Sequence, residues 1–163
     1  MENKNGIVIR SAEKEDVGLI LSFIKELADY EKLTDAVTAD ENLLTETMFG
    51  KDAVPKSLLA FYKDEPAGFA IYFYNFSTFI GKPGLYLEDV YVKPELRGKG
   101  IGKQVLIYLA KIASEKDCGR FEWSVLDWNE PSIKFYKNLG AKPMDDWTVF
   151  RLDRMGIENL SRL

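Results

Sequence analysis

Hydrophobic and polar positions follow a helical period in four stretches of the chain, and each stretch predicts a helix. Thr38 and Glu41 form a capping-box pattern that would begin the second helix, and Gly50 would end it. The four helices are expected from about residue 11, from 38 to 50, from 101 onward and from 131 to 139.

Between the helices, short runs rich in β-branched and aromatic residues predict strands. Turn-forming residues from Lys63 to Pro66 separate two of these runs and predict an antiparallel hairpin. The predicted strands cover residues 7–9, 57–62, 67–76, 85–92, 121–126 and 147–152. The order β-α-α-β-β-β-α-β-α-β indicates a single α/β domain over residues 1–163, a mixed sheet with helices on its faces. Residues 154–163 fit either a terminal helix or a loose tail.

Composition narrows the chemistry that such a domain can perform. The 163 residues include no histidine, which excludes histidine-based nucleophile systems and HExxH metal sites. The single Cys118 cannot build a thiolate zinc site or an internal disulfide, so we expect no metal. Catalysis must then use carboxylates, tyrosine, lysine, backbone amides or a bound cofactor.

Charge and hydropathy bear on partners and location. The net charge of −4 and the pI near 5.0 argue against nucleic acid as a partner and suit a cationic ligand better. We expect no signal peptide, because the opening residues 1–6 contain no apolar h-region. We expect no membrane association, because the longest strongly apolar stretch, 68–74, is too short to span a bilayer. These features predict a cytoplasmic protein.

The strongest local signal is the glycine-rich segment Arg97-Gly98-Lys99-Gly100-Ile101-Gly102-Lys103, which follows a strand and opens a helix. Alternating glycines let successive backbone N–H groups face one point, and the positive end of the helix dipole lies beside them. The spacing fits neither the P-loop nor the dinucleotide fingerprint. An unliganded turn is the alternative, but the interleaved cations favour an anion site for a pyrophosphate.

This segment resembles the R/Q-x-x-G-x-G/A loop of the GNAT N-acetyltransferases, which holds the pyrophosphate of acetyl-CoA. Runs at 23–31, 85–92 and 128–137 look like the spermidine/spermine (diamine) acetyltransferase branch, and 125–129 looks closer to its thialysine acetyltransferase relatives. The resemblance implies a GNAT-like, mostly antiparallel sheet flanked by helices. It also implies acetyl-CoA as cosubstrate, with no metal, and a homodimer.

Two residues match the family's catalytic pair. Glu88 matches the base, which an amine acceptor needs because a lysine-like amine at pH 7 costs about 4.6 kcal/mol to deprotonate. Tyr136 matches the general acid that protonates the departing thiolate. Neighbouring Glu88 and Asp89 would point to opposite faces of a regular strand, so both reach one site only if a bulge intervenes. By pattern alone, Tyr136 would be a core aromatic and the carboxylates solvated charges.

Further residues carry implied binding roles. Cofactor contacts fall to the glycine-rich segment and to Val90, Tyr91, Val92, Asn129, Ser132 and Lys137. Acceptor contacts fall to Tyr30, Glu31, Asp89, Glu122, Trp123, Ser124, Asp145, Asp146 and Trp147. Acidic groups beside aromatic faces suit an alkylammonium.

The sequence leaves the acceptor open. It departs from the family at Pro83-Gly84 and in a shorter acidic loop before Trp147, and both changes touch the implied acceptor pocket. A polyamine or diamine and a lysine analogue such as thialysine both remain as the small amine substrate, and Asp127 leans toward the second. The alternatives are a non-catalytic CoA-binding regulatory module and an acetyltransferase acting on a protein amine.

Overall fold

The computed structural model describes residues 2–163, which divide into two compact units. The first unit ends at Ser124 and the second covers Val125–Leu163. The glycine-rich segment and the carboxylates of the predicted base strand lie in the first unit. Tyr136 lies in the second.

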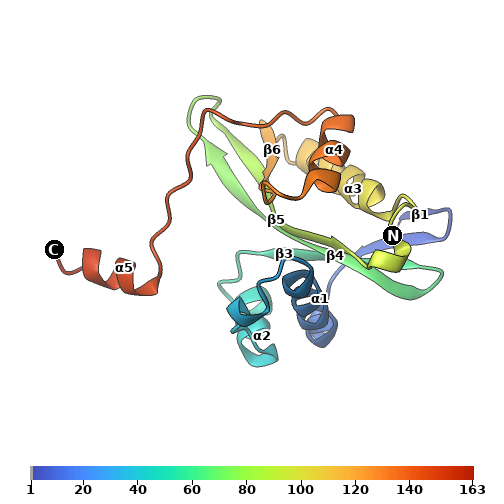
Figure 1. Ribbon diagram of the computed structural model, residues 1–163, viewed down its shortest axis with the longest axis horizontal. Helices are drawn as coiled ribbons and strands as arrows, with labels where there is room; N and C mark the ends of the chain where they lie inside the picture. The colour runs from blue at the N-terminus through green and yellow to red at the C-terminus, as the bar shows by residue number, and fades with distance from the viewer. Residues whose placement is uncertain (1) are drawn as a thin grey trace. The chain divides into compact units, whose positions relative to one another are not determined.

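A six-stranded sheet forms the framework of the first unit (Figure 1). The strands lie side by side in chain order, antiparallel throughout except that the last strand runs parallel to its neighbour. They are β1 (Glu2–Lys4), β2 (Ile7–Ser11), β3 (Lys56–Tyr62), β4 (Glu65–Ser77), β5 (Lys82–Val92) and β6 (Arg120–Trp123). The predicted mixed, mostly antiparallel α/β fold is confirmed, and β1 is an addition to the predicted order.

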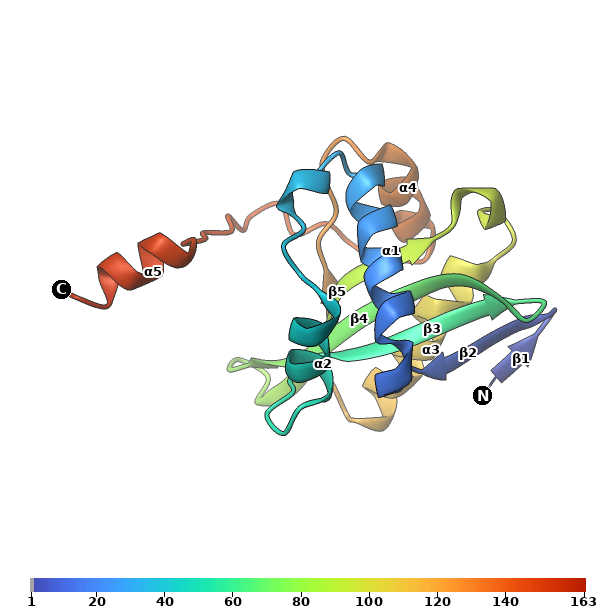
Figure 2. The same cartoon turned by 90° about the horizontal axis from the view of Figure 1, so that it is seen from below.

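Three helices cover this sheet. Helices α1 (Val17–Tyr30) and α2 (Glu41–Phe49) lie on one face, and α3 (Ile101–Glu115) lies on the other (Figures 1 and 2). A short 3₁₀ helix, η2 (Thr34–Ala36), lies between α1 and α2 in the chain. The second unit holds α4 (Glu130–Asn138) and α5 (Arg154–Leu160), so residues 154–160 are helical.

The core between α1 and the sheet is aromatic. Phe23 of α1 stacks on Phe69 of β4 with ring centroids 5.6 Å apart, and Tyr91 of β5 tilts against Phe23 at 6.2 Å. Phe23 and Phe69 are fully buried. Burying such a side chain contributes roughly 1.5–3 kcal/mol, so this contact fixes α1 against β4 and β5.

The predicted hairpin is confirmed and its turn chemistry is clear. Tyr62 pairs with Glu65, and the two residues between them, Lys63 and Asp64, both have positive φ, 52° and 68°. Positive φ at both central positions defines the turn that matches the twist of a two-residue hairpin, and aspartate tolerates it better than most residues.

Several element boundaries differ from the sequence prediction by a few residues, and the structure gives the reason at the starts of α1 and α2. Helix α1 begins at Val17 rather than near Ser11, because Ser11 pairs with Leu58 as the last residue of β2. The capping-box prediction for α2 is wrong: the carboxylate of Asp40 accepts from the Leu43 amide at 2.8 Å. That bond makes Asp40 the N-cap, one residue before Glu41. Strand β6 ends at Trp123 instead of residue 126.

The predicted closing strand at 147–152 is also wrong. These residues have no strand pairing, and their apolar members are exposed, with Phe150 at 91% and Val149 at 82%. Asp153, whose carboxylate accepts from the Gly156 amide at 2.7 Å, instead caps α5 directly after them. The β-branched and aromatic composition signalled a strand, but a strand forms only where a neighbour supplies hydrogen bonds.

Candidate active site

The glycine-rich segment forms an open turn that ends in α3. Gly98 and Gly100 have φ of +79° and +87°, which glycine adopts without strain. A Cβ added at either position would meet nothing within 4 Å, so the space in front of the turn is open. Gly100 is the N-cap of α3 and supplies no side-chain cap, which leaves the first amides of α3 available to an anion. The turn thus fits a pyrophosphate.

The cations of this segment are exposed, but one of them is held in place. The Arg97 guanidinium carbon lies 4.3 Å from the centroid of the Tyr30 ring, and its Nε donates to the Val92 carbonyl at 3.0 Å. Lys99 lies farther from its aromatic neighbour, with Nζ 5.7 Å from the Tyr62 ring centroid. The arginine side chain therefore links the segment to the end of α1.

Strand β5 is bulged at the position of the predicted base. Ile71 of β4 pairs with Asp89 and the next residue, Tyr72, pairs with Leu87, so Glu88 is the extra residue. Asp89 and Tyr91 accordingly face α1, whereas Leu87 faces the opposite side of the sheet with Tyr72. The bulge that the two adjacent carboxylates require is therefore present.

Strands β5 and β6 part just before the bulge. Their parallel pairing runs from Gly84 with Arg120 to Leu87 with Trp123 and ends there. Beyond Leu87, β5 continues to Val92, and among the residues that the structure describes it pairs there with β4 but no longer with β6. The Tyr91 side chain itself is buried and bonds Glu26, so it is the backbone of 90–92, and not the Tyr91 ring, that can face a ligand.

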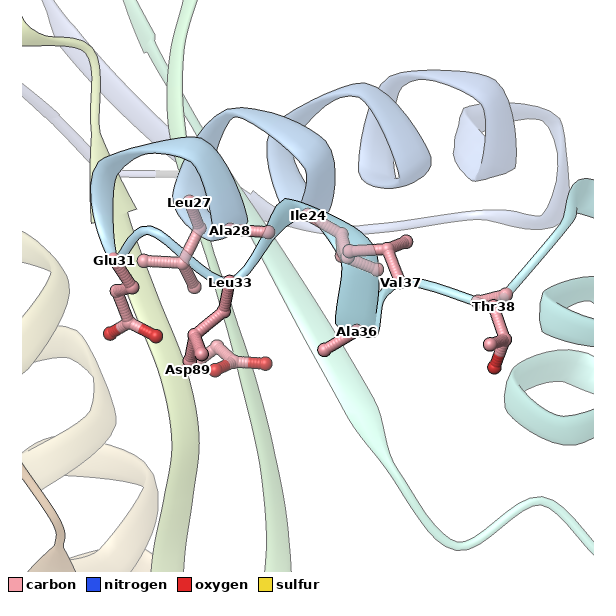
Figure 3. Close-up of a pocket in the computed structure, with 10 residues that line it drawn as sticks. Ile24, Leu27, Ala28, Glu31, Leu33, Ala36, Val37, Thr38 and Asp89 are labelled. Atoms are coloured by element: carbon pink, nitrogen blue, oxygen red, sulfur yellow. The ribbon is translucent and has the colours of Figure 1, made fainter.

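A pocket of about 310 Å³ lies beneath the end of α1, on the same face as Asp89 (Figure 3). Its walls are mainly apolar, and Glu31 and Asp89 lie toward one end with Thr38 toward the other. The lining residues are Ile24, Leu27, Ala28, Glu31, Leu33, Ala36, Val37, Thr38, Ala39 and Asp89. Two predicted acceptor residues, distant in sequence, thus share one cavity.

The pocket raises the proton affinity of both carboxylates. Burial, reinforced by repulsion from Glu88 and then Glu31, raises the pKa of Asp89 to about 6. Burial also raises the pKa of Glu31. No cation lines the pocket, so an incoming ammonium would supply the missing counter-charge.

The predicted acceptor residues on β6 and directly after it have other partners. Glu122 pairs with Arg120 (2.8 Å) and accepts from Asn75 (3.4 Å), which neutralises its charge. The Trp123 ring packs edge-on against Phe121 at 4.9 Å, and the Ser124 hydroxyl bonds that of Tyr86 at 2.9 Å. Glu122 is therefore a weaker candidate for binding a substrate cation than Glu31 or Asp89.

The remaining predicted residues lie in the second unit. Asn129 is buried and caps α4, and its side-chain oxygen accepts from the Ser132 amide at 3.4 Å. Tyr136 is half-buried on α4, with its ring 5.4 Å from that of Phe135. Lys137, Asp145, Asp146 and Trp147 are exposed. Their roles in binding or catalysis stay predictions.

Sequence reasoning missed the apolar half of the pocket. Ile24, Leu27 and Val37 line it, but in the sequence their spacing signals only the buried face of a helix and a loop. Helical period does identify Ile24 and Leu27 as inward-facing, and they are only partly buried by the rest of the core. Nothing local marks Val37 as part of the same wall.

Residues 22–141 match the model of the Acetyltransferase (GNAT) family. The chain belongs to the GNAT acetyltransferase family. It is 37% identical to thialysine N-epsilon-acetyltransferase of Sus scrofa, covering 95% of this chain and 97% of that protein. It is 35% identical to the human spermidine/spermine N(1)-acetyltransferase-like protein 1, over 90% of this chain and 22% of that protein.

A solved structure agrees with the fold. An integron cassette protein from the mobile metagenome of V. cholerae superposes with a TM-score of 0.81 at 28% identity, covering 97% of this chain and 99% of that one. The chain is therefore an acetyl-CoA-dependent N-acetyltransferase that acts on amines of small metabolites.

Residues 2–163 of this GNAT domain carry neither a candidate membrane span nor a candidate metal centre. No helix among them is both long and apolar enough to cross a membrane. Over the same residues, His, Cys, Asp and Glu side chains form no group of three or more that could hold a metal ion.

Proposed function

We propose that this enzyme transfers the acetyl group directly from acetyl-CoA to the primary amine of a small cationic metabolite, either a lysine analogue such as thialysine or a polyamine. The observation that carries this proposal is the pocket beside α1, where Glu31 and Asp89 face an apolar cavity with no cation in its lining. An alkylammonium offers the charge that these carboxylates lack and the methylenes that the walls can cover.

Each residue in the proposal has one task. Acetyl-CoA supplies a thioester already activated toward amines. The amides of the turn at 98–103 bind its pyrophosphate, and Lys99 and Lys103 add positive charge. The backbone of 90–92, beyond the end of the β5–β6 pairing, holds the pantetheine arm, with Asn129, Ser132 and Lys137 as further contacts.

Proton transfers complete the reaction. A carboxylate on the bulged strand β5 accepts the proton of the ammonium, and the neutral nitrogen then attacks the thioester carbon. Tyr136 donates its phenolic proton to the sulfur as the carbon–sulfur bond breaks. The second proton of the attacking nitrogen then passes to the Tyr136 phenolate, which gives the neutral amide and restores the phenol. A phenol with an ordinary pKa near 10 is protonated at pH 7 and can serve a thiolate whose conjugate acid lies near 8.5.

Acetylation rates measured side by side with thialysine, lysine, spermidine and putrescine test the acceptor. The named activity of the pig relative favours thialysine, and the human relative favours spermidine. A kcat/KM at least tenfold higher for one class identifies the acceptor. Failure of the protein to take up coenzyme A in a calorimeter would overturn the proposal as a whole.

The proposal extends to location and assembly. A single domain acting in the cytoplasm fits the lone Cys118, which has no disulfide partner in the chain. A homodimer fits the exposed apolar run of Trp147, Val149, Phe150 and Leu152, which a second copy would cover. Sedimentation equilibrium distinguishes a dimer near twice 18.6 kDa from a monomer.

A further inference from the structure

The last residues of β5 form a strand end with one free edge. Beyond Leu87 the pairing with β6 stops, and across the described chain residues 89–92 pair with β4 alone. On the β4 side the approach is close, because Val92 pairs with Gly68 and a Cβ added to Gly68 would collide with the Tyr91 carbonyl. A backbone that offers its other edge to a ligand needs supporting contacts that hold it in one position.

The side chain of Tyr91 supplies such a contact on the face that α1 covers. It is 5% exposed, its ring centroid lies 6.2 Å from that of Phe23, and its hydroxyl bonds the carboxylate of Glu26. Phe23 and Glu26 both belong to α1, so the ring and the hydroxyl tie the end of β5 to that helix. Ring packing leaves some freedom of position, whereas a hydrogen bond to a carboxylate is directional and roughly twice as strong as one between neutral groups.

The phenol keeps its proton for this bond. Burial, followed by the negative charge of Glu26 and by the bond itself, raises the pKa of Tyr91 to about 12. Arg97 acts in the opposite direction from 5.8 Å above the ring, and its Nε donates to the Val92 carbonyl at 3.0 Å. Residues 91 and 92 are therefore held from α1 and from the start of the glycine-rich turn, and their other edge faces the space where β6 has parted.

We propose that Tyr91 is a positioning residue for acetyl-CoA: its hydroxyl, bound to Glu26, fixes the free edge of β5 on which the pantetheine arm lies. The inference rests on the cosubstrate site proposed above. The pantetheine arm carries two amide groups, which can pair with a strand edge as an added strand does. The phenol acts through the backbone of its own strand, and an edge already fixed in position costs less ordering when the arm binds.

Tyr91→Phe tests the hydroxyl without removing the ring. The dissociation constant for acetyl-CoA, measured by calorimetry, should rise about tenfold, while kcat and KM for thialysine change less than threefold. Tyr72→Phe is the matched control. Tyr72 is also 5% exposed and also has its pKa raised to about 12, but it lies on the opposite face of the sheet, beside Leu87. Its variant should bind acetyl-CoA as the wild type does.

A fragment of the cosubstrate distinguishes positioning of the strand edge from a general loss of structure. Adenosine 3′,5′-bisphosphate carries phosphates but no pantetheine arm, so its dissociation constant, measured by competition with acetyl-CoA, should change less than twofold in Tyr91→Phe. A general loosening of the fold would weaken binding of both ligands.

Variants of Glu26 test the other end of the bond. Glu26→Gln keeps an oxygen that can accept from the phenol and should bind acetyl-CoA within about threefold of the wild type. Glu26→Leu keeps no acceptor and should lose about tenfold. Combining Glu26→Leu with Tyr91→Phe should add little to either single effect, because both remove the same bond.

The results that contradict the inference differ from those that contradict the proposed function. Unchanged acetyl-CoA binding in Tyr91→Phe, or an equal loss for acetyl-CoA and adenosine 3′,5′-bisphosphate, would overturn the role of the hydroxyl while acetyl transfer stands. Fully multiplicative losses in the double variant would overturn it too, since the two groups would then act separately. A wild-type protein that takes up no coenzyme A would overturn the proposed function and the inference together.

Discussion

The pocket beside α1 and the glycine-rich turn offer a ligand opposite environments within one unit. The pocket is lined by side chains, carries two negative groups and is partly closed by apolar walls. The turn consists of backbone amides and glycines, carries exposed cations and is open in front. Burial strengthens charge effects in the first, as the raised pKa of Asp89 demonstrates, whereas solvent screens them in the second. Selectivity should therefore lie in the pocket, and affinity for the cosubstrate in the turn.

The largest expected effect comes from a residue that belongs to neither region. Tyr136→Phe removes a proton donor but no binding group, so kcat should fall about 100-fold while both Kd for CoA and KM for the amine change less than threefold. Tyr74→Phe, which removes another phenol from β4, is the control with near-normal kcat. Stopped-flow rates combined with calorimetry check this, and an unchanged kcat would remove Tyr136 as the acid.

The contrast between the two regions also explains what could be predicted from the sequence. The turn is local: Gly98 and Gly100 with their flanking cations stand together in the chain, and their positive φ follows from residue type. The pocket is not local. Asp89 meets Glu31 because the Phe23–Phe69 stack sets α1 against β4 and because the bulge turns Asp89 toward it. Neither cause is visible in a strand pattern.

Errors in element prediction have the same origin. Asp40 caps α2 although Thr38 offered the familiar capping box, because the helix begins at the residue whose carboxylate reaches an orphan amide. The run at 147–152 has strand composition but no strand partner. Propensity identified most elements correctly, and tertiary pairing decided the exceptions.

The next effect tests whether the turn depends on backbone shape. Gly100→Ala adds a Cβ at φ +87°, where it strains the backbone without touching another atom, and should weaken binding of acetyl-CoA about tenfold. Gly81→Ala carries the same strain, with φ +66° and open space, in the hairpin between β4 and β5 and is the matched control. Equal Kd values for CoA in the two variants would contradict a specific role of the turn.

At the pocket, removing a charge is expected to stabilise the fold. The pKa of Asp89 rises on folding from 3.8 to about 6, so the native state binds more protons and the free energy of unfolding falls as pH rises from about 4 to 6. Asp89→Asn should therefore be more stable than the wild type above pH 6, by about 1–2 kcal/mol after allowance for partial exposure, and no more stable near pH 4. Urea unfolding at pH 4 and 7.5 checks the sign, with Asp35→Asn, which removes an exposed carboxylate that does not line the pocket, as control. If Asp89→Asn were less stable than the wild type at pH 7.5, the ionised carboxylate of Asp89 would not destabilise the folded state.

The smallest expected effect concerns the contact between Arg97 and Tyr30, which links the two regions. The Arg97 guanidinium lies over Tyr30, the residue before Glu31, and so connects the start of the turn with the end of the pocket. A cation–π contact at such an exposed site is worth roughly 0.5–1 kcal/mol. Arg97→Gln and Tyr30→Leu should each raise KM for thialysine about two- to fivefold, and the double variant should add little to either single effect.

Two control variants accompany this test. Tyr30→Phe keeps the ring and should stay near wild type. Lys99→Gln removes a cation of the same turn that contacts Tyr62 instead, and it should raise KM for acetyl-CoA alone. Additive effects in the double variant would mean that the pocket and the turn work independently.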